Sequence, residues 1–587
     1  MRSIFCGLLL IATSADAFAA TRESPLTTVA EQSGFVRTGR YPEVEALCRN
    51  FAERYADAVR CIRFGVTPEG RPMQALVVSR SGALTAAAAK TARLPVIFIQ
   101  GGIHAGEIDG KDAGFLAIRE LLDGKVGKGD LDKQVVVFVP VFNIDGHERF
   151  GRWNRPNQRG PEEMGWRTTA QNLNLNRDYV KADAPEMRAM LALVNEWDPI
   201  VYADLHVTDG AKFEHDVSIQ IEPLNAGDSE MRSAGKALSG ALLGALKAQG
   251  SLPLAFYPSF VKSDDPSSGI EDGVAPPRFS HGYFQLRNRF GMLVETHSWK
   301  NYKTRVRITR NLIVNLVAET AKQGKTWLQA ADAADQRSSE LAGIDVTLDW
   351  RTGPAVRMID FRGYAYTRTP SDVSGSLMTR YDEGKPQVWK MPLRDDIVPD
   401  LVVKAPVAGY LVPVAYASQV AALLDTHGIR YQRKEAPGLA LAVQVFRASG
   451  VELSADSVEG HQRATITGQW TEESRNIPAG SLFVPIAQPK SRLLMTILEP
   501  QASDSLAAWG MFNNAFEAKE YMEAYVAEDV AREQLKDPAI AAEFAARLAN
   551  DPEFAKSPYK RLEFFARRHS SWDERYQLYP VYRVASP

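Results

Sequence analysis

Four short apolar runs, each followed within a few residues by polar side chains, constrain the fold of this chain more than any other feature. Runs of this kind, separated by helical patterns, indicate strands of a largely parallel sheet that is covered on both faces. Such sheets bind ligands beyond the carboxyl ends of their strands, so the polar groups are expected to meet in one crevice. The runs are 94–99 before His104 and Glu107, 135–141 before Asn143 and Asp145, 200–205 before His206, and 292–294 before Glu295.

The predicted fold class is therefore α/β: a doubly wound, mixed but largely parallel sheet with helices on both faces. Beyond about residue 340, β-branched and aromatic runs alternate with Gly and Pro turns, which predicts a C-terminal β-rich region and then a helical one. The expected parts are a first domain over 21–330, a β-rich domain over 340–510 and a mostly helical segment over 511–587. Helices are expected at 41–58, 107–122, 185–197, 228–248, 305–322 and 417–428.

The first residues have the pattern of a cleavable signal peptide over 1–20. Arg2 precedes an apolar stretch that is followed by Ala17-Phe-Ala19, a cleavage site with small residues at its first and third positions. A secreted or periplasmic protein is expected, and no later apolar run is long enough for stable membrane insertion. Cys48 and Cys61 remain after cleavage, and a lone pair in an oxidising compartment is expected to form a disulfide. The net charge of −2 argues against a nucleic-acid partner.

The strongest chemical signal is the pair His104 and Glu107, with His206 much later in the chain. Two imidazole nitrogens and one carboxylate form the donor set of a catalytic zinc, which leaves a fourth position open for water. A histidine and a glutamate three residues apart occur by chance in many proteins. Here each of the three residues also follows a predicted strand, so we expect one zinc ion per chain at these ligands.

These residues, with Asn176-Arg177 in the stretch 172–179 and Glu295 in Leu293-Val-Glu-Thr-His, resemble the M14 zinc carboxypeptidase family. The resemblance covers roughly residues 25 to 325. It implies a metallocarboxypeptidase whose partner is a peptide or peptide-like substrate with a free carboxylate. The oligomeric state is left open.

The resemblance also implies a role for each matching residue. Glu295 is the expected general base and acid, and Asn176 with Arg177 is expected to bind the terminal carboxylate. An arginine is expected to polarise the scissile carbonyl. Arg167 is the first choice for it, with Arg155 and Arg152 as alternatives. A substrate-binding tyrosine on a loop before the glutamate is assigned to Tyr283, with packing in an aromatic core as the alternative for this residue. Four histidines near the strand ends are interpreted as non-ligands: His147, His215, His281 and His297.

Two parts of the sequence depart from the family pattern. Asn174 stands where relatives often have an aspartate that orients a zinc-bound histidine, and Asp204 is a possible substitute. Val207 and Thr208 differ from the residues that follow the second histidine in digestive relatives, so the substrate pocket is expected to differ.

Three other functions are weighed against the carboxypeptidase. A zinc amidase or deacylase would use the same residues on cell-wall peptides or N-acyl amino acids. An inactive peptidase-like binding protein would have lost a ligand or Glu295, and none is missing. A serine hydrolase would need a Gly-x-Ser-x-Gly elbow, which the sequence lacks.

Overall fold

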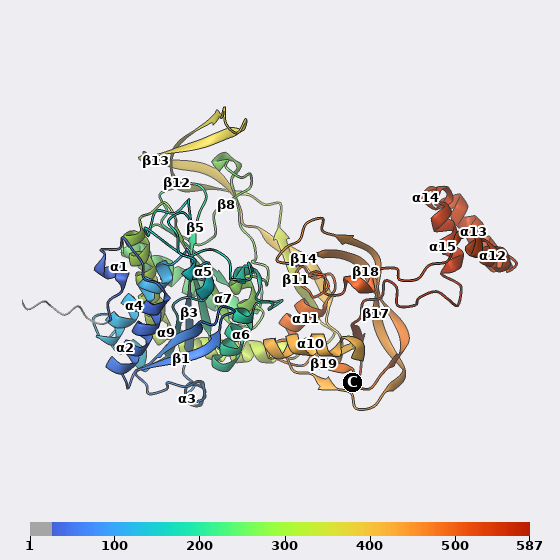
Figure 1. Cartoon of the computed structure of the whole chain (residues 1–587), viewed down its shortest axis with the longest axis horizontal. Coiled ribbons are helices and arrows are strands. Elements are labelled where there is room, and N and C mark those ends of the chain that lie inside the picture. Colours follow the sequence, from blue (N-terminus) through green and yellow to red (C-terminus); the bar gives the residue numbers. More distant parts are fainter. Residues whose placement is uncertain (1–25, 587) are drawn as a thin grey trace, which may run out of the picture.

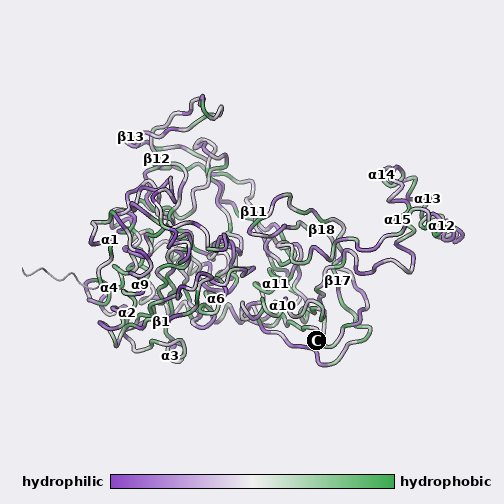
Figure 2. The backbone as a smooth tube through the Cα atoms, in the orientation of Figure 1, coloured by the Kyte–Doolittle hydropathy of each residue, from purple (hydrophilic) through white to green (hydrophobic). Residues whose placement is uncertain are grey.

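The computed structural model describes residues 26–586. The expected signal peptide at 1–20 lies outside this range. The described chain forms an N-terminal body around one large sheet, a C-terminal β-rich body beside it and a small helical lobe that projects away from both (Figure 1). Hydrophobic segments run through the interior of the two bodies, and hydrophilic segments form most of the outer loops (Figure 2).

The large sheet has eight strands in the order β1-β2-β4-β3-β5-β10-β6-β7. Its centre is parallel, because β4, β3, β5 and β10 pair side by side in the same direction. The flanking pairs of β1 with β2, β2 with β4 and β10 with β6 are antiparallel. The predicted mixed, largely parallel sheet is confirmed. The strands are β1 (Val59–Val66), β2 (Pro72–Val78), β3 (Val96–Gly101), β4 (Val135–Val139), β5 (Val201–Thr208), β6 (Val217–Glu222), β7 (Pro253–Leu254) and β10 (Phe290–His297).

Helices pack on both faces of this sheet. Successive residues of a strand point to opposite faces. In β5, Leu205 lies against Gly110 of α4 (Asp109–Leu122), whereas the ring of Tyr202 stacks on Phe284 of α8 (Ser280–Gln285). The other main helices of this body are α2 (Tyr41–Arg54), α6 (Pro185–Trp197), α7 (Ser229–Ala248) and α9 (Tyr302–Ser338).

The helix α9 is much longer than the predicted 305–322. It continues to Ser338 and carries the chain out of the N-terminal body towards the C-terminal one. The part of α9 beyond residue 322 contains no proline and one glycine, the residue types that most often end a helix. Its one glycine, Gly324, packs against Pro95, where a Cβ atom would come within 2.6 Å of the proline ring. The helix thus reaches past the expected end of the first domain at 330.

The C-terminal region contributes three sheets. A two-stranded sheet pairs β11 (Asp345–Thr352) with β14 (Ile397–Lys404). The long hairpin of β12 (Arg357–Pro370) and β13 (Leu377–Arg394) joins β9 (Ile270–Glu271) and β8 (Ser259–Phe260) of the N-terminal body. A six-stranded sheet has the order β16-β19-β15-β20-β17-β18. Its strands are β15 (Gly409–Val412), β16 (Gln432–Arg433), β17 (Gly438–Leu453), β18 (Ala464–Ile477), β19 (Leu482–Pro485) and β20 (Tyr582–Val584).

Helices of the C-terminal region fall into two groups. The first, α10 (Val414–His427) and α11 (Ser491–Leu498), packs within the β-rich body. The second forms the projecting lobe: α12 (Ala524–Gln534), α13 (Pro538–Asn550), α14 (Pro552–Lys556) and α15 (Pro558–Ala566). Phe554, Phe564 and Phe565 form the small core of the lobe. After the lobe the chain returns, and β20 is inserted between β15 and β17.

Cys48 of α2 and Cys61 of β1 form a disulfide with a Cα–Cα distance of 5.4 Å, as predicted. The bond joins the first helix of the sheet domain to its edge strand. No helix within residues 26–586 combines the length and the apolar character that a membrane crossing requires.

Candidate metal centre

Three side chains from two separate segments meet beside the central strands. His104 and Glu107 lie in the turn between β3 and α4, and His206 lies near the end of β5. His104 Nδ1 is 3.0 Å from Glu107 Oε1, and His206 Nδ1 is 3.0 Å from Glu107 Oε2. All three residues are buried, and their ligand atoms lie within 4.8 Å of one another. No other group of three such side chains occurs in the described part of the chain.

This donor set fits zinc. Tetrahedral ligands at about 2.0–2.1 Å from one ion stand roughly 3.4 Å apart, close to the distances found here. Each histidine presents Nδ1 to the cluster, and its Nε2 faces a second oxygen. His104 Nε2 lies 3.1 Å from Asn174 Oδ1, and His206 Nε2 lies 3.1 Å from Asp204 Oδ2. The hydrogen bond with Asn174 holds the His104 ring in the orientation that a metal ligand needs, whereas the contact of His206 with Asp204 lacks hydrogen-bond geometry.

The departure from the family pattern at Asn174 leaves His104 with an oxygen partner. Asn174 occupies the place of the expected aspartate and still presents an oxygen to His104. Asp204 does not take this place; it lies within ion-pair distance of the other histidine, His206. Asp204 is held in turn by Gln100 and Ser280, which donate hydrogen bonds of 2.7 Å to its two oxygens.

Glu295 lies directly opposite His206, because the two residues are register partners in the parallel pair β10 and β5. Both strands continue two residues past these side chains, so the residues lie within the strands and not after them. Glu295 is 8% exposed, and its Oε2 has no hydrogen-bond partner within the described structure. Burial raises the pKa of Glu295 to about 8, while His206 and Arg155 oppose the shift.

The three arginines considered from the sequence are placed differently. Arg155 is buried, with Nη1 2.9 Å from Glu107 Oε1 and Nη2 donating to the Val207 carbonyl at 2.9 Å. Arg167 is 3.4 Å from the same Glu107 oxygen, and 39% of its side chain is exposed. Arg152 is exposed and lies over the ring of Trp153. Arg155 and Arg167 therefore reach the cluster, and only Arg167 has its guanidinium partly free for a substrate.

Asn176 and Arg177 lie in a short 3₁₀ turn after Asn174. Asn176 is buried and its Oδ1 has no hydrogen-bond partner among residues 26–586. The Arg177 guanidinium lies 4.3 Å from the centre of the Phe279 ring and donates to the Asn176 carbonyl, with no carboxylate within ion-pair distance in the described chain. Burial and the neighbouring Arg167 and Arg278 lower the pKa of Arg177 to about 10. An unpaired guanidinium in this setting favours an incoming anion.

The prediction that Tyr283 binds the substrate is wrong, because its side chain is not accessible to a substrate. Tyr283 is fully buried in α8, where its hydroxyl bonds with His427 Nδ1 at 2.8 Å and its ring packs on Tyr179 and Phe284. The tyrosine beside the cluster is Tyr257, whose hydroxyl lies 2.7 Å from Thr208 Oγ1. Burial and the charge of Glu295 raise the pKa of Tyr257. Its position in the loop 255–258 carries no periodic pattern, and only its place before Glu295 could have indicated it.

The remaining polar groups of the strand ends are structural. Asn143 donates to the Arg167 carbonyl at 3.0 Å and so supports the loop of that arginine. Asp145 pairs with Arg71 and accepts from Thr67. The histidines 147, 215, 281 and 297 do not belong to the metal cluster.

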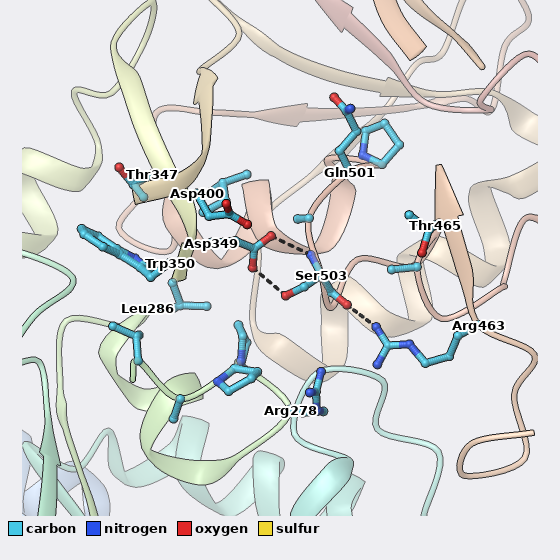
Figure 3. Close-up of a pocket in the computed structure, with 18 of the residues that line it drawn as sticks. Arg278, Leu286, Thr347, Asp349, Trp350, Asp400, Arg463, Thr465, Gln501 and Ser503 are labelled. Atoms are coloured by element: carbon cyan, nitrogen blue, oxygen red, sulfur yellow. Dashed lines mark hydrogen bonds between the residues drawn. The ribbon is translucent and has the colours of Figure 1, made fainter. Parts of the chain in front are cut away.

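A cavity of about 620 Å³ between the N-terminal body and the β-rich body is separate from this cluster (Figure 3). Arg278, Asp349 and Arg463 line it, and Asp349 accepts two hydrogen bonds from Ser503. None of the three metal-site residues, and neither Glu295 nor Arg177, lines this cavity. The metal cluster and Glu295 therefore lie outside this cavity.

Comparison with known proteins agrees with this site. The zinc carboxypeptidase family matches residues 44–242, a range that contains both histidines, Glu107 and Arg177 but ends before Glu295. Carboxypeptidase B of Helicoverpa zea is 28% identical over 170 residues, which are 26% of this chain and 38% of that protein. The chain thus spans well under half of the length of this curated relative.

Two solved structures are also similar. Carboxypeptidase A from Helicoverpa armigera is 17% identical, with a TM-score of 0.35, and the match covers 50% of this chain and 74% of that one. A metallo-carboxypeptidase from Burkholderia cenocepacia is 16% identical, with a TM-score of 0.34, over 47% of this chain and 69% of that one. The region 44–242, with His104, Glu107 and His206, thus matches the zinc carboxypeptidase family.

Proposed function

We propose that this chain is an exported zinc metallocarboxypeptidase. Its substrate is a peptide or peptide-like molecule, and the bond hydrolysed is the amide next to the C-terminal carboxylate. The observation that carries the proposal is the meeting of the His104–Glu107–His206 cluster with Glu295 on the neighbouring strand. A zinc ion held by these three ligands, one per chain, would polarise a carbonyl and lower the pKa of a bound water towards roughly 7.

The protein side chains supply the remaining steps. Glu295 takes a proton from the attacking water and delivers it to the leaving amide nitrogen. Arg167, with a partly free guanidinium 3.4 Å from Glu107, stabilises the negative charge that develops on the carbonyl oxygen. Arg155 instead fixes Glu107 through its 2.9 Å contact.

Substrate binding depends on the attraction between the negatively charged C-terminal carboxylate and a positively charged side chain. Arg177 and Asn176 receive the terminal carboxylate through their N–H groups, and the unpaired Arg177 guanidinium supports this role. Tyr257 replaces Tyr283 as the tyrosine that contacts the substrate, because its hydroxyl lies beside Thr208, two residues after the ligand His206.

Substrate profiling of the purified, zinc-loaded protein tests the proposal. Release of the C-terminal residue from ordinary L-peptides, lost with a chelator and restored by zinc, is the expected result. Turnover only of D-residue, γ-linked or N-acylated substrates would favour an amidase or deacylase with the same site. Binding of peptides without turnover of any substrate would indicate a binding protein.

A further inference from the structure

One carboxylate of the C-terminal β-rich body holds the loop beside Arg177. Asp504, in the turns that follow α11, accepts hydrogen bonds from the backbone N–H of Arg278 at 2.9 Å and from its Nη1 at 2.8 Å. The two residues are 226 positions apart in the chain. Arg278 lies in the loop 272–279 between β9 and α8, which contains neither helix nor strand. The contact therefore joins the two bodies at a loop that regular structure does not fix.

The surroundings of Asp504 keep its carboxylate in place. Asp504 is fully buried, and in the described part of the chain it is the only carboxylate within ion-pair distance of Arg278. The neighbouring Ser503 donates two hydrogen bonds to Asp349 of β11. Arg463 of the β-rich body is 3.7 Å from the same carboxylate, and both arginines line the cavity between the bodies (Figure 3). A buried, charge-assisted contact of this kind is stronger than an exposed ion pair.

The ring of Phe279 connects this contact to Arg177. Phe279 directly follows Arg278 in the chain, and the Arg177 guanidinium lies 4.3 Å from the centre of its ring. The Arg278 guanidinium lies 5.6 Å from the same centre. Within residues 26–586, the Arg177 side chain donates only to the Asn176 carbonyl, so the ring is its other direct support. The position of the ring depends in turn on where the backbone of Arg278 is held.

The same contact also determines which guanidinium is free. Burial and the charges of Arg167 and Arg278 lower the pKa of Arg177 to about 10, and the charge of Asp504 acts against them. Because Asp504 pairs with Arg278, the second guanidinium on the ring is already neutralised. The terminal carboxylate of a substrate is therefore left to Arg177.

We propose that Asp504 is a positioning residue for the subsite that binds the terminal carboxylate. It holds the backbone of Arg278, which places the Phe279 ring against Arg177. The β-rich body thereby completes a subsite whose binding residues, Asn176 and Arg177, belong to the N-terminal body. The inference rests on the proposed function and assigns part of its substrate binding to a residue outside the region 44–242 that matches the family. Asp504 acts through Arg278 and Phe279 and does not itself contact the substrate.

Steady-state kinetics of Asp504→Ala test this inference with one peptide in two forms, with a free C-terminal carboxylate and with an amide. KM for the free carboxylate should rise about tenfold, in the range of a partly buried cation–π contact. The value of kcat, and KM for the amide, should change less than about threefold, because only uniform binding of the terminus is lost. Loss of the negative charge alone would instead lower KM for the free carboxylate. Such a fall, or an equal rise for both forms, would overturn the inference.

Two further variants test the path through the ring. Asp504→Asn keeps an oxygen for the Arg278 N–H and should bring KM back to within about threefold of the wild type. Phe279→Leu removes the aromatic face and should raise KM for the free carboxylate even if Asp504→Ala is too unstable to purify. In Asp504→Ala combined with Phe279→Leu the two effects should not add, because both remove the same support. Additive effects, or an unchanged KM in Phe279→Leu, would contradict the path.

Arg463→Gln is the matched control. It removes a charged neighbour of Asp504 in the same interface but leaves both contacts with Arg278. The variant should therefore lower the melting temperature and leave KM for the free carboxylate unchanged. A rise in KM as large as that of Asp504→Ala would show a general effect of the interface and count against a positioning role.

A binding measurement separates this inference from the proposed function. Calorimetric titration of the Glu295→Gln variant with the two forms of the peptide needs no turnover. Preference for the free carboxylate, lost when Asp504→Ala is added, would support the inference even if no peptide is hydrolysed. The same preference in both proteins would refute the inference and leave the carboxypeptidase in place. No preference in either protein would refute recognition of the terminus, and the inference with it.

Discussion

The carboxylate of Glu459 accepts a hydrogen bond of 2.8 Å from the backbone N–H of Asn174, although 285 residues separate them. Glu459 lies in the loop between β17 and β18, and Asn174 is the residue behind His104. Close by, His461 Nε2 lies 2.7 Å from Asp183. The C-terminal β-rich body is therefore in direct contact with the support of the metal centre.

Glu459→Ala is expected to weaken zinc binding several-fold, because it releases the backbone of the residue that orients His104. Loss of a direct partner of a ligand typically costs about 10–100-fold in affinity, and Glu459 is one step further away. Glu459→Gln keeps an oxygen at this position and should bind zinc almost as tightly as the wild type. Competition with a zinc chelator measures both. Glu472→Ala, on an exposed site of β18, is the control, and an equal effect there would contradict the contact.

Glu295→Gln should keep about one zinc per chain while kcat falls by a factor of about 10²–10⁴, the usual contribution of general acid–base catalysis. The reason is that the amide cannot accept the proton of the attacking water, although it fills the same space on β10. Elemental analysis and steady-state kinetics on the same preparation provide the two readouts. Unchanged turnover would remove Glu295 from the mechanism.

Arg177→Ala should raise KM for peptides with a free terminal carboxylate far more than for the same peptides with an amidated terminus. The charged hydrogen bond to the terminus is lost only in the first series. Arg177→Lys should recover part of the binding, because it restores a charge without the bidentate geometry. The same rise in KM for both series would argue against recognition of the terminus by this side chain.

Substitutions of Tyr257 and of Tyr283 should have different effects, one on catalysis and the other on stability. Tyr257→Phe removes a hydroxyl beside the catalytic cluster and should reduce kcat/KM with little change in the melting temperature. Tyr283→Phe removes the buried partner of His427 and should lower stability by about 1 kcal/mol while kinetics stay close to the wild type. Thermal melting and kinetics on both variants check the pair. A kinetic defect confined to Tyr283→Phe would restore the first assignment.

The sequence predicted the parts of the site that come directly after an apolar run. His206 and Glu295 end apolar runs whose length and composition indicate central parallel strands, and parallel register then places them side by side. Tyr257 could not be predicted in this way, because its loop has no periodic pattern and its neighbours are fixed by tertiary packing. Glu459 lies in a turn of another sheet, and nothing near it in the chain indicates a contact with Asn174.

In the C-terminal half, too, contacts between distant segments could not be predicted from the sequence. Its strands were predictable from their β-branched and aromatic composition, but the partner of each strand was not. The pairing of β13 with β9 joins segments more than a hundred residues apart. Local propensity indicates that a strand exists, whereas long-range contacts decide where it lies.

Glu222, a residue outside the catalytic cluster, should contribute strongly to the change of the unfolding free energy with pH. Its side chain is buried at the end of β6 and accepts a hydrogen bond of 2.7 Å from the Leu224 N–H. Burial raises the pKa of Glu222 from 4.5 to about 7, so the folded state holds this proton more tightly than the unfolded state does. The stability that it contributes is complete below about pH 4.5 and is lost as the pH rises towards 7.

Glu222→Gln removes this titration and keeps an oxygen for the Leu224 N–H. We compare the free energy of unfolding of the variant with that of the wild type at each pH. The variant's value minus the wild-type value should be about 2–3 kcal/mol higher at pH 8 than at pH 5, because each pKa unit corresponds to about 1.4 kcal/mol. Denaturant unfolding of both proteins at the two pH values measures the difference, and the other titrating groups cancel in the comparison. The same gap between the proteins at pH 5 and at pH 8 would mean that Glu222 does not change its proton affinity on folding.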